Sequence, residues 1–315
     1  MTSSTYSLEH PVLGIVTVLY NCDEVLPDFF ESLAAQRDEL RYRLYVIDNS
    51  TTDSGSRLSR ELATRHGIDA VVVFNNDNGG VAKGNNQGIE RALADGCPLV
   101  LLANNDTVFP PGTIAGLVET LRREKADAVT PKIYYHGTGG KLWYAGGAFH
   151  EWTLRTPHLG NLEQDKGQHD KPGDTEYAPT CFMLVDAKVF GRIGRMDEQY
   201  FCYYDDTDFV WRLRKAGGRL YYQPRCVVDH KVSTSTGGDR SPFSLYYMNR
   251  NRVYFARKNF RGLHRVFTLC YMTLTRLPRA FALEKKLSER LWKGVRDGWR
   301  LELPRRGATP EATGR

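Results

Sequence analysis

The chain has 315 residues, of which 41% are hydrophobic and 25% charged, and its formal net charge is +6 at pH 7. A chain of this length and composition can bury a large core, which excludes a globally disordered protein. Its six cysteines are widely spaced and form no Cys-x-x-Cys pair, so we expect reduced thiols and no zinc site.

The N-terminus is polar, and alternating strand and helix signals follow it. Residues 1–11 contain no apolar stretch typical of a secretory signal, so we expect a disordered N-terminus on a cytoplasmic protein. Apolar runs typical of buried strands cover Leu13–Leu19, Leu44–Ile47, Ala70–Phe74, Leu99–Ala103 and Ala126–Thr130. Helical spacing lies between them, over Glu24–Gln36, Ser54–His66, Lys83–Ala94 and Pro111–Arg123. This order predicts an α/β fold with a Rossmann-like, mostly parallel, doubly wound sheet over residues 12–130.

Residues 131–240 lose this regular alternation. Their first part is rich in aromatic residues and glycine, and the polar segment Asn161–Asp174 predicts hairpins followed by a mobile loop. A strand is expected at Tyr177–Val185, a helix at Phe209–Ala216, and short strands at Arg219–Gln223 and Cys226–Asp229. We expect residues 12–240 to form one domain, with residues 131–240 as its second half.

Residues 241–303 are predicted to be helical and are rich in Arg and Lys. The helix Tyr246–Phe260 interleaves aromatic and basic side chains, which could grip a diphosphate. Leu263–Arg279 and Leu283–Trp299 are amphipathic and basic, as in helices that lie on an anionic membrane surface. An ordinary helical cap on the domain is the alternative. No apolar run in this region is long enough to span a bilayer, and residues 304–315 are expected to form a disordered tail.

Polar residues follow four of the predicted strands. They are Tyr20-Asn21, Asp48-Asn49-Ser50, Asn75-Asn76-Asp77-Asn78-Gly79-Gly80 and Asn104-Asn105-Asp106. Ligands of such sheets bind at the carboxyl ends of the strands, so we expect these side chains to line one pocket. The alternative is that Asn and Asp bond their own backbone in turns. No glycine fingerprint follows the first strand, which argues against a Rossmann dehydrogenase.

An acidic cluster, Asp205-Asp206-Thr207-Asp208, stands at the start of a predicted helix. A carboxylate there could accept the proton of an attacking hydroxyl, and an acidic neighbour improves such a base by raising its pKa. Capping of the helix N-terminus is the alternative. Asp208 can pair with Arg212 four residues later, which predicts a surface ion pair for Asp208.

These motifs carry a resemblance to a known family. The segments VTVLYN, VIDNSTTDSG, NNDNGGVAKGNNQGI and LLANNDTVFP resemble, in order and spacing, the nucleotide-binding half of family 2 glycosyltransferases, which have the GT-A fold. Tyr200–Gly217, followed by Asp229-His230-Lys231, resembles their acceptor and catalytic region. The chain is most similar to the rhamnosyltransferase-like subgroup of bacterial cell-surface polysaccharide assembly. The resemblance therefore implies a GT-A catalytic domain with a donor half at 12–130, an acceptor half at 131–240 and a C-terminal helical extension.

The resemblance also implies donor-binding residues. Asp48 matches the aspartate that accepts a hydrogen bond from a pyrimidine N3–H, although a turn or cap role is open for it. Lys83 could reach a phosphate or could mark a solvated helix start. The full set that is expected to line the donor comprises Tyr20, Asn21, Asp48, Asn78, Gly80, Lys83, Asn86, Asn104 and Asn105.

A divalent cation, Mg²⁺ or Mn²⁺, is implied at Asp106. This residue matches the end of the D-x-D motif, where a hard cation with oxygen ligands bridges the donor diphosphate. Asn104 replaces the first aspartate of the motif, which leaves one protein carboxylate for the cation. His230 resembles a second metal ligand in some members of the family, with a structural histidine as the alternative. The resemblance implies Asp206 as the catalytic base, with Asp205 as the second choice.

We therefore expect an inverting glycosyltransferase that moves L-rhamnose from dTDP-rhamnose to a hydroxyl of a saccharide or lipid-linked saccharide. The alternatives are another donor (UDP-galactofuranose, UDP-GlcNAc or UDP-glucose) or a non-catalytic subunit that binds a sugar nucleotide or a glycan. The expected location is cytoplasmic or peripheral on the inner face of the cytoplasmic membrane. No motif indicates a nucleic-acid partner.

Overall fold

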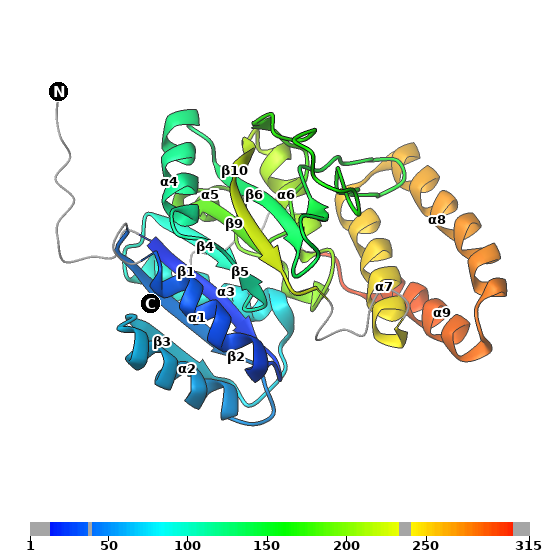
Figure 1. The fold of residues 1–315 in the computed structure, drawn as a ribbon. Coiled ribbons are helices and arrows are strands. Elements are labelled where there is room, and N and C mark those ends of the chain that lie inside the picture. Colours follow the sequence, from blue (N-terminus) through cyan, green and yellow to red (C-terminus); the bar gives the residue numbers. More distant parts are fainter. Residues whose placement is uncertain (1–12, 37–39, 233–240, 305–315) are drawn as a thin grey trace.

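The computed structural model describes residues 13–36, 40–232 and 241–304 (Figure 1). The expectations for residues 1–11 and for nearly all of the tail at 304–315 lie outside these ranges. Within them the protein consists of one mixed sheet with helices on both faces, and a group of C-terminal helices at one side of it (Figure 1).

The first half of the sheet is parallel, as predicted. Its strands lie in the spatial order β3-β2-β1-β4. The order departs from the chain order at β1, which lies between β2 and β4, so the ends of these strands form a topological switch point. The elements are β1 (Leu13–Leu19), η1 (Asp23–Val25), α1 (Leu26–Ala34), β2 (Tyr42–Asp48), α2 (Ser54–His66), β3 (Ala70–Phe74), α3 (Gly80–Ala94) and β4 (Leu99–Ala103).

Helix α3 approaches β1 closely because two of its residues are glycines. A Cβ atom on Gly88 would lie 2.3 Å from Cγ1 of Val16, and one on Gly84 would lie 2.7 Å from Cγ1 of Val18. Contacts this short are not tolerated, so only glycine permits this packing. The glycines of this stretch therefore seat the helix on the central strand.

The second half of the sheet is mixed. Strand β9 lies antiparallel between β4 and β6, while β10 runs parallel to β6 and pairs with β5 at its far end. The segment 136–181 contains no helix that could make a parallel crossover, so β9 returns antiparallel to β6. The elements are β5 (Thr107–Val108), α4 (Thr113–Glu124), β6 (Ala128–Tyr135), β7 (Leu142–Tyr144), β8 (Gly173–Asp174), β9 (Phe182–Asp186), α5 (Ala187–Ile193), η2 (Glu198–Tyr200), α6 (Asp205–Lys215) and β10 (Leu220–His230).

Strand β10 is continuous where the sequence predicts two short strands. Its pairing with β6 shifts register between Gln223 and Val227. Pro224 lies inside this interval and cannot donate to the ladder, so the strand bulges there and continues. The bulge keeps the strand long enough to carry His230 to the edge at which β5 pairs with it.

Three helices complete the fold, which confirms the predicted C-terminal extension. They are α7 (Pro242–Asn259), α8 (Gly262–Ala282) and α9 (Lys285–Arg300). Helix α7 lies between the body of the protein and α8, which is the outermost element in this view (Figure 1). A second apolar core joins these helices to the body through Trp211, Phe255, Phe260 and Met272. Among the described residues, no helix combines the length and apolar character needed to span a membrane.

Candidate functional site

The ends of β1 and β2 are tied together by hydrogen bonds. The Asp48 side chain is fully buried, and its two oxygens accept bonds from the Ser50 amide (3.0 Å) and the Ser56 hydroxyl (2.7 Å). The backbone amide of Asn21 donates to the hydroxyl of Ser50 at 2.8 Å. Tyr20 remains 39% exposed beside this junction. Asp48 therefore organises the turn that follows β2, and its role toward a nucleobase stays a prediction.

The predicted donor residues around the start of α3 differ in their surroundings. Asn78 Oδ1 accepts a bond from the amide of Gly80 at 3.1 Å, and Lys83 is exposed. Asn86 is buried, and its amide group bonds the backbone of Met196 in both directions, at 2.9 Å each. The structure thus gives Asn86 a second role, in joining α3 to the segment that precedes η2.

Asp106 and His230 are brought together by β5, a two-residue strand that the sequence analysis did not predict. Thr107 of β5 lies opposite His230 in an antiparallel pair, and the backbone carbonyl of Asp106 accepts a bond from the amide of Lys231 at 2.9 Å. His230 Nε2 therefore lies 3.1 Å from Asp106 Oδ1. Burial acts to raise the pKa of Asp106, but the charges of His230 and Lys231 hold it below its usual value.

Two buried atoms of this pair suit a cation. Asp106 Oδ1 is buried without a hydrogen bond of good geometry and faces His230 Nε2 at 3.1 Å, so a cation shared by the pair would take these two atoms. His230 Nδ1, on the other side of the ring, is also buried without a partner. Within the described ranges, no group of three or more His, Cys, Asp or Glu side chains is arranged for metal binding. The pair fits a divalent cation only if other ligands, such as diphosphate oxygens, complete its coordination.

The predecessors of Asp106 face inward as well. Asn105 is buried and its amide nitrogen lies 2.7 Å from Cys22 Sγ. The backbone of Asn104 is held by Cys181 and Thr107, at 2.7 and 2.6 Å. The strand end is therefore rigid, which favours a fixed position for the Asp106 carboxylate.

Asp205 and Asp206 form the first residues of α6. Burial and the charge of Asp206 raise the pKa of Asp205. Burial also raises the pKa of Asp206, against the hydrogen bonds that its carboxylate accepts from Tyr177 and Thr207. The Tyr177 hydroxyl donates to Asp206 Oδ2 at 2.5 Å, and the Thr207 amide donates to Oδ1 at 2.6 Å. A half-buried carboxylate with a raised pKa is suited to accept a proton.

Asp208 corrects the expectation of a surface ion pair. The pair with Arg212 exists, at 2.7 Å, but Asp208 is completely buried. Lys258 of α7 approaches the same carboxylate at 2.8 Å, and the Asn259 amide donates to it at 3.1 Å. The positive charges of Lys258 and Arg212 hold the pKa of Asp208 well below its usual value in spite of its burial. The expectation was wrong because α7 covers this face of α6, which helical spacing within α6 does not reveal.

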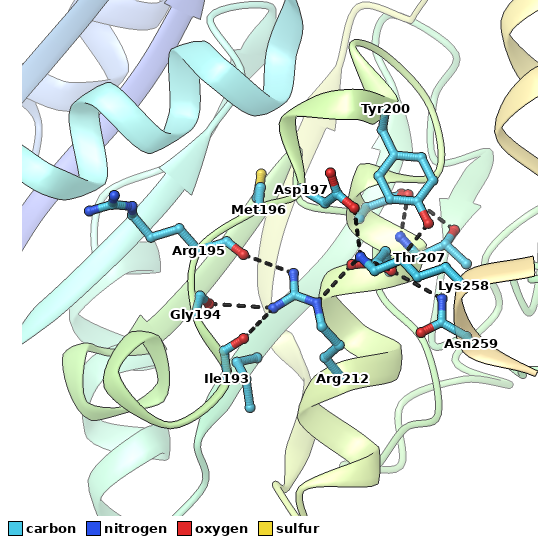
Figure 2. A network of polar contacts seen from close by, with 12 residues as sticks. Ile193, Gly194, Arg195, Met196, Asp197, Tyr200, Thr207, Arg212, Lys258 and Asn259 are labelled. Carbon is cyan, nitrogen blue, oxygen red and sulfur yellow. Dashed lines mark hydrogen bonds and ion pairs between the residues drawn. The ribbon is translucent and has the colours of Figure 1, made fainter. Parts of the chain in front are cut away.

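Arg212 and Lys258 extend this network to the loop before η2. Arg212 donates to backbone carbonyls of that loop, among them Ile193 and Arg195 (Figure 2). Lys258 also pairs with Asp197 at 2.7 Å, from the end of α7 (Figure 2). The start of α6, the loop before η2 and the C-terminal helices are therefore held as one unit.

The turn between η2 and α6 is strained. Phe201, Tyr203 and Tyr204 all have positive φ angles, of 64°, 64° and 66°. Such angles cost roughly 1–3 kcal/mol each for bulky residues and persist only where the surroundings impose them. The amide nitrogen of Asn251 lies within 2.8 Å of the backbone carbonyls of Tyr200, Cys202 and Tyr203. Helix α7 thus holds the backbone that leads directly into Asp205.

An aromatic wall runs from the Asp106–His230 pair toward Asp206. The Trp143 ring meets the rings of His230 and His158 edge to face, with centroids 4.7 and 4.6 Å apart. His158 Nδ1 lies 3.0 Å from the Trp143 carbonyl. Burial lowers the pKa of His158 to about 4, so its ring is neutral near pH 7.

The wall continues to the acidic pair through Tyr177. The His158 and Tyr177 rings stack with centroids 5.8 Å apart, and the Tyr177 hydroxyl reaches Asp206. Burial, followed by the charges of Asp106 and then Asp206, raises the pKa of the Cys181 thiol. Both carboxylates therefore lie within electrostatic reach of one thiol.

The structure thus gathers the predicted residues into two groups. Residues at the ends of β1, β2 and α3 form the first, and Asp106, His230, Asp205 and Asp206 form the second. Sequence reasoning missed Tyr177 and Asn251, which touch or support the acidic cluster, because polarity inside an aromatic segment is too weak a signal to assign a partner. Lys258 belongs to the basic helix that was expected to grip a diphosphate, but it pairs with Asp197 and Asp208 instead.

Comparison with known proteins places this chain in a family of enzymes. Residues 14–194 match the model of the family described as Glycosyl transferase family 2. The match spans more than half of the chain but ends before Asp206 and His230. The family model therefore does not test the roles expected for these two residues.

Relatives and solved structures give the same picture. An N-acetylglucosaminyl-diphospho-decaprenol L-rhamnosyltransferase of Mycobacterium tuberculosis is 28% identical over 79% of this chain and 85% of its own length. A dTDP-rhamnosyl transferase of Shigella flexneri is 24% identical over 77% and 82%. A mannosyltransferase of Pyrobaculum calidifontis, solved with GDP-Man and Mn²⁺, superposes with a TM-score of 0.56 at 14% identity, over 95% and 89% of the two chains. This last likeness confirms the GT-A type of fold.

Proposed function

Because the chain belongs to glycosyl transferase family 2 and is a nucleotide-sugar glycosyltransferase, we propose that it transfers L-rhamnose from dTDP-rhamnose with inversion. The acceptor is a hydroxyl of a saccharide or lipid-linked saccharide in cell-surface glycan synthesis. The observation that carries the proposal is the aromatic wall that joins the Asp106–His230 pair to Asp206. It supports a single catalytic centre in which the Asp106–His230 pair serves the diphosphate and Asp206 serves the acceptor hydroxyl.

Asp206 acts as the base in this proposal. Its carboxylate takes the proton of the acceptor hydroxyl while that oxygen attacks the anomeric carbon from the face opposite the diphosphate. One displacement inverts the anomeric configuration, through a transition state that resembles an oxocarbenium ion. The Tyr177 hydroxyl and the Thr207 amide orient the carboxylate. Asp205 places a second carboxyl group beside it.

Asp106 and His230 hold a divalent cation in this proposal. When bound, the cation neutralises charge that develops on the leaving diphosphate. The approach of His230 Nε2 to the buried Asp106 Oδ1 at 3.1 Å, where that oxygen has no hydrogen bond of good geometry, supports this assignment. A nitrogen ligand beside a carboxylate favours Mn²⁺ over Mg²⁺.

The names of two relatives support the proposed donor and acceptor. Two of them have names that specify rhamnosyl transfer, and one of these specifies a lipid diphosphate saccharide as its acceptor. A cytoplasmic location agrees with the six free thiols of the chain, because disulfides are rare in that compartment.

A donor panel tests the proposed substrate. The protein with Mn²⁺ is mixed with dTDP-rhamnose, UDP-galactofuranose, UDP-GlcNAc, UDP-glucose or GDP-mannose, and its melting temperature and donor hydrolysis are measured. A ligand at 100 times its Kd stabilises the fold by about 2.7 kcal/mol, which gives a clear rise in Tm. We expect the rise only with dTDP-rhamnose. A rise with a UDP-sugar alone would replace the donor and leave the transferase assignment intact.

The variant Asp106→Ala tests the cation site. It should remove the dependence of donor affinity on Mn²⁺, measured by calorimetry with and without the ion. Asp229→Ala, whose side chain belongs to the same strand as His230, is the matched control and should keep that dependence. Equal donor affinity of the wild-type protein with and without Mn²⁺ would overturn the role of Asp106.

A further inference from the structure

The outermost helix carries a continuous apolar stripe that faces away from the protein. Six large apolar residues of α8 remain exposed, and their separations along the helix are one, three, four or seven positions; both ends of the stripe, Leu263 and Phe281, are 87% exposed. This spacing places them on one face of the helix. The stripe consists of Leu263, Val266, Phe267, Leu274, Leu277 and Phe281.

The stripe is not a poorly packed core face, because α8 buries a different face. Thr268, Met272 and Ala280 are buried, and the Arg276 guanidinium donates to Asn249 of α7 at 2.8 Å. Helix α8 thus has one face on α7 and an opposite face that is apolar and open. Its sequence contains no Asp or Glu, so nothing acidic interrupts this face.

A basic surface adjoins one end of the stripe. The outer face of α9 carries the basic residues Lys285, Lys293 and Arg296 and one acidic residue, Glu289. They line a hollow of about 750 Å³ together with Phe281 and Trp292. Apolar side chains and cations therefore meet where α8 turns into α9, which is the combination that the interface of an anionic bilayer accommodates.

We propose that the α8 stripe and the outer face of α9 dock the protein on an anionic phospholipid membrane. The stripe lies in the boundary between headgroups and acyl chains, and the lysines and arginine of α9 contact lipid phosphates. The inference goes beyond the proposed function, because it concerns a surface outside the transfer site and requires neither donor nor acceptor.

A series of contacts links the docked surface to the segment that carries the acidic pair. Trp152, which is exposed, packs against Phe267 at the start of the stripe with centroids 5.3 Å apart. Leu154, two residues later, accepts a hydrogen bond from the Tyr204 hydroxyl at 3.3 Å, and Tyr204 directly precedes Asp205.

A second copy of the chain fits this surface less well than lipid does. Two stripes packed together would bring the basic outer faces of two α9 helices into the same region, and like charges oppose such pairing. A bilayer that contains phosphatidylglycerol supplies both the apolar boundary and the opposite charge.

Vesicle flotation tests the proposal with the full chain. Phosphatidylcholine vesicles with and without phosphatidylglycerol are mixed with the protein in the absence of any sugar nucleotide. We expect flotation with phosphatidylglycerol only, and weaker flotation at about 1 M salt, where the screening length falls to about 3 Å. No flotation on phosphatidylglycerol vesicles would overturn the proposal.

Matched variants separate the two parts of the surface. Leu263→Ser, Leu274→Ser and Phe281→Ser combined should reduce vesicle binding more than tenfold, because three apolar anchors are lost. Lys285→Glu and Lys293→Glu should each reduce it about fivefold or more, on phosphatidylglycerol alone. The controls are Leu162→Ser, at a site 60% exposed, and Lys188→Glu, at an exposed position of α5. Equal loss in the controls would contradict the assignment to α8 and α9.

Two further measurements keep the result interpretable. Unchanged Tm and unchanged donor hydrolysis in the triple variant show that the fold and the transfer site are intact. Sedimentation velocity without lipid should show a monomer, both for the wild-type protein and for the triple variant. A wild-type dimer that the triple variant dissociates would assign the stripe to a second copy and overturn membrane docking.

Discussion

The two halves of the candidate site hold their carboxylates in different ways. Asp48 of the donor half is bonded by Ser50 and Ser56, which lie two and eight positions away in the sequence. Asp208 of the acidic cluster is bonded by Arg212, four positions away, and also by Lys258 and Asn259, which lie 50 and 51 positions away. Of these two carboxylates, Asp48 is held by nearby turn residues, and Asp208 depends in addition on a distant helix.

This difference predicts which segment of the chain each part of the site depends on. A change in α7 should disturb the acidic cluster and leave the ends of β1 and β2 as they are. A change in α2 should do the opposite. Each of the following experiments compares one half with the other.

The largest effect is expected from Asp206→Asn. Loss of a general base should lower kcat by about 10²–10⁴-fold, while the Kd of the donor stays the same. Asp48→Asn, the counterpart in the donor half, should mainly raise that Kd. Transfer assays with titration calorimetry measure both quantities. Near wild-type kcat in Asp206→Asn would show that another residue is the base.

Removal of the Lys258 ammonium group should lower the free energy of unfolding more than any change in the donor half. Lys258→Met leaves Asp208 and Asp197 without one of their partners, and breaking a buried ion pair costs about 3–5 kcal/mol. Urea unfolding gives the free energy. The control Lys188→Met, on an exposed lysine, should cost close to nothing. A loss in Lys258→Met as small as in that control would refute the structural role of α7.

The matched change in the donor half is Ser56→Ala. It removes the hydroxyl that donates to Asp48 at 2.7 Å, and an unsatisfied buried group costs about 1–3 kcal/mol. We expect a smaller fall in unfolding free energy than in Lys258→Met, together with weaker donor binding and unchanged kcat at saturating donor. A fall in saturated kcat would mean that the two halves are coupled.

The smallest effect concerns the pH dependence of transfer. The raised pKa values of Asp205 and Asp206 predict that kcat falls on acidification at a pH above the usual aspartate range. Tyr177→Phe removes a hydrogen bond that lowers the pKa of Asp206, so this fall should move to higher pH. Tyr222→Phe, whose hydroxyl instead bonds the His169 carbonyl, should leave the profile unchanged. A profile that does not move in Tyr177→Phe would separate Asp206 from the observed titration.

The acidic pair and Asp208 have opposite effects on how the free energy of unfolding changes with pH. A carboxyl with a raised pKa in the fold stabilises it below the usual aspartate pKa, and this contribution is lost as the pH rises through the folded value. Asp208, whose pKa is lowered, contributes above the usual value and loses its contribution as the pH falls. Relative to the wild-type protein, the free energy of unfolding of Asp206→Asn should therefore increase as the pH rises, and that of Asp208→Asn should decrease.

The sequence alone was sufficient to predict the strands and helices of the parallel half of the sheet. The strands Leu13–Leu19, Ala70–Phe74 and Leu99–Ala103 and the helix Ser54–His66 have the predicted bounds, because apolar period and local turns determine them. The GT-A fold and its C-terminal helices are confirmed as well. The antiparallel insertion of β9 was not predicted, since strand order depends on contacts between distant segments.

The site shows the same division. The acidic pair was found because adjacent carboxylates are visible in the sequence, and the structure supports the raised pKa expected of them. The burial of Asp208 was missed because it depends on α7. The contact of Asp106 with His230 depends on β5, and two residues are too few to give a periodic signal.

Gly80 is where the two halves touch. Its φ angle is +85°, and a Cβ atom on it would lie 2.4 Å from the carbonyl oxygen of Phe201, which accepts a bond from the Val81 amide at 2.6 Å. A single methyl group at this position would therefore push the donor helix away from the turn that carries the base. The spacing between α3 and the turn at Phe201 is consequently limited by a single hydrogen atom of Gly80, and a substitution at position 80 offers a direct way to widen it.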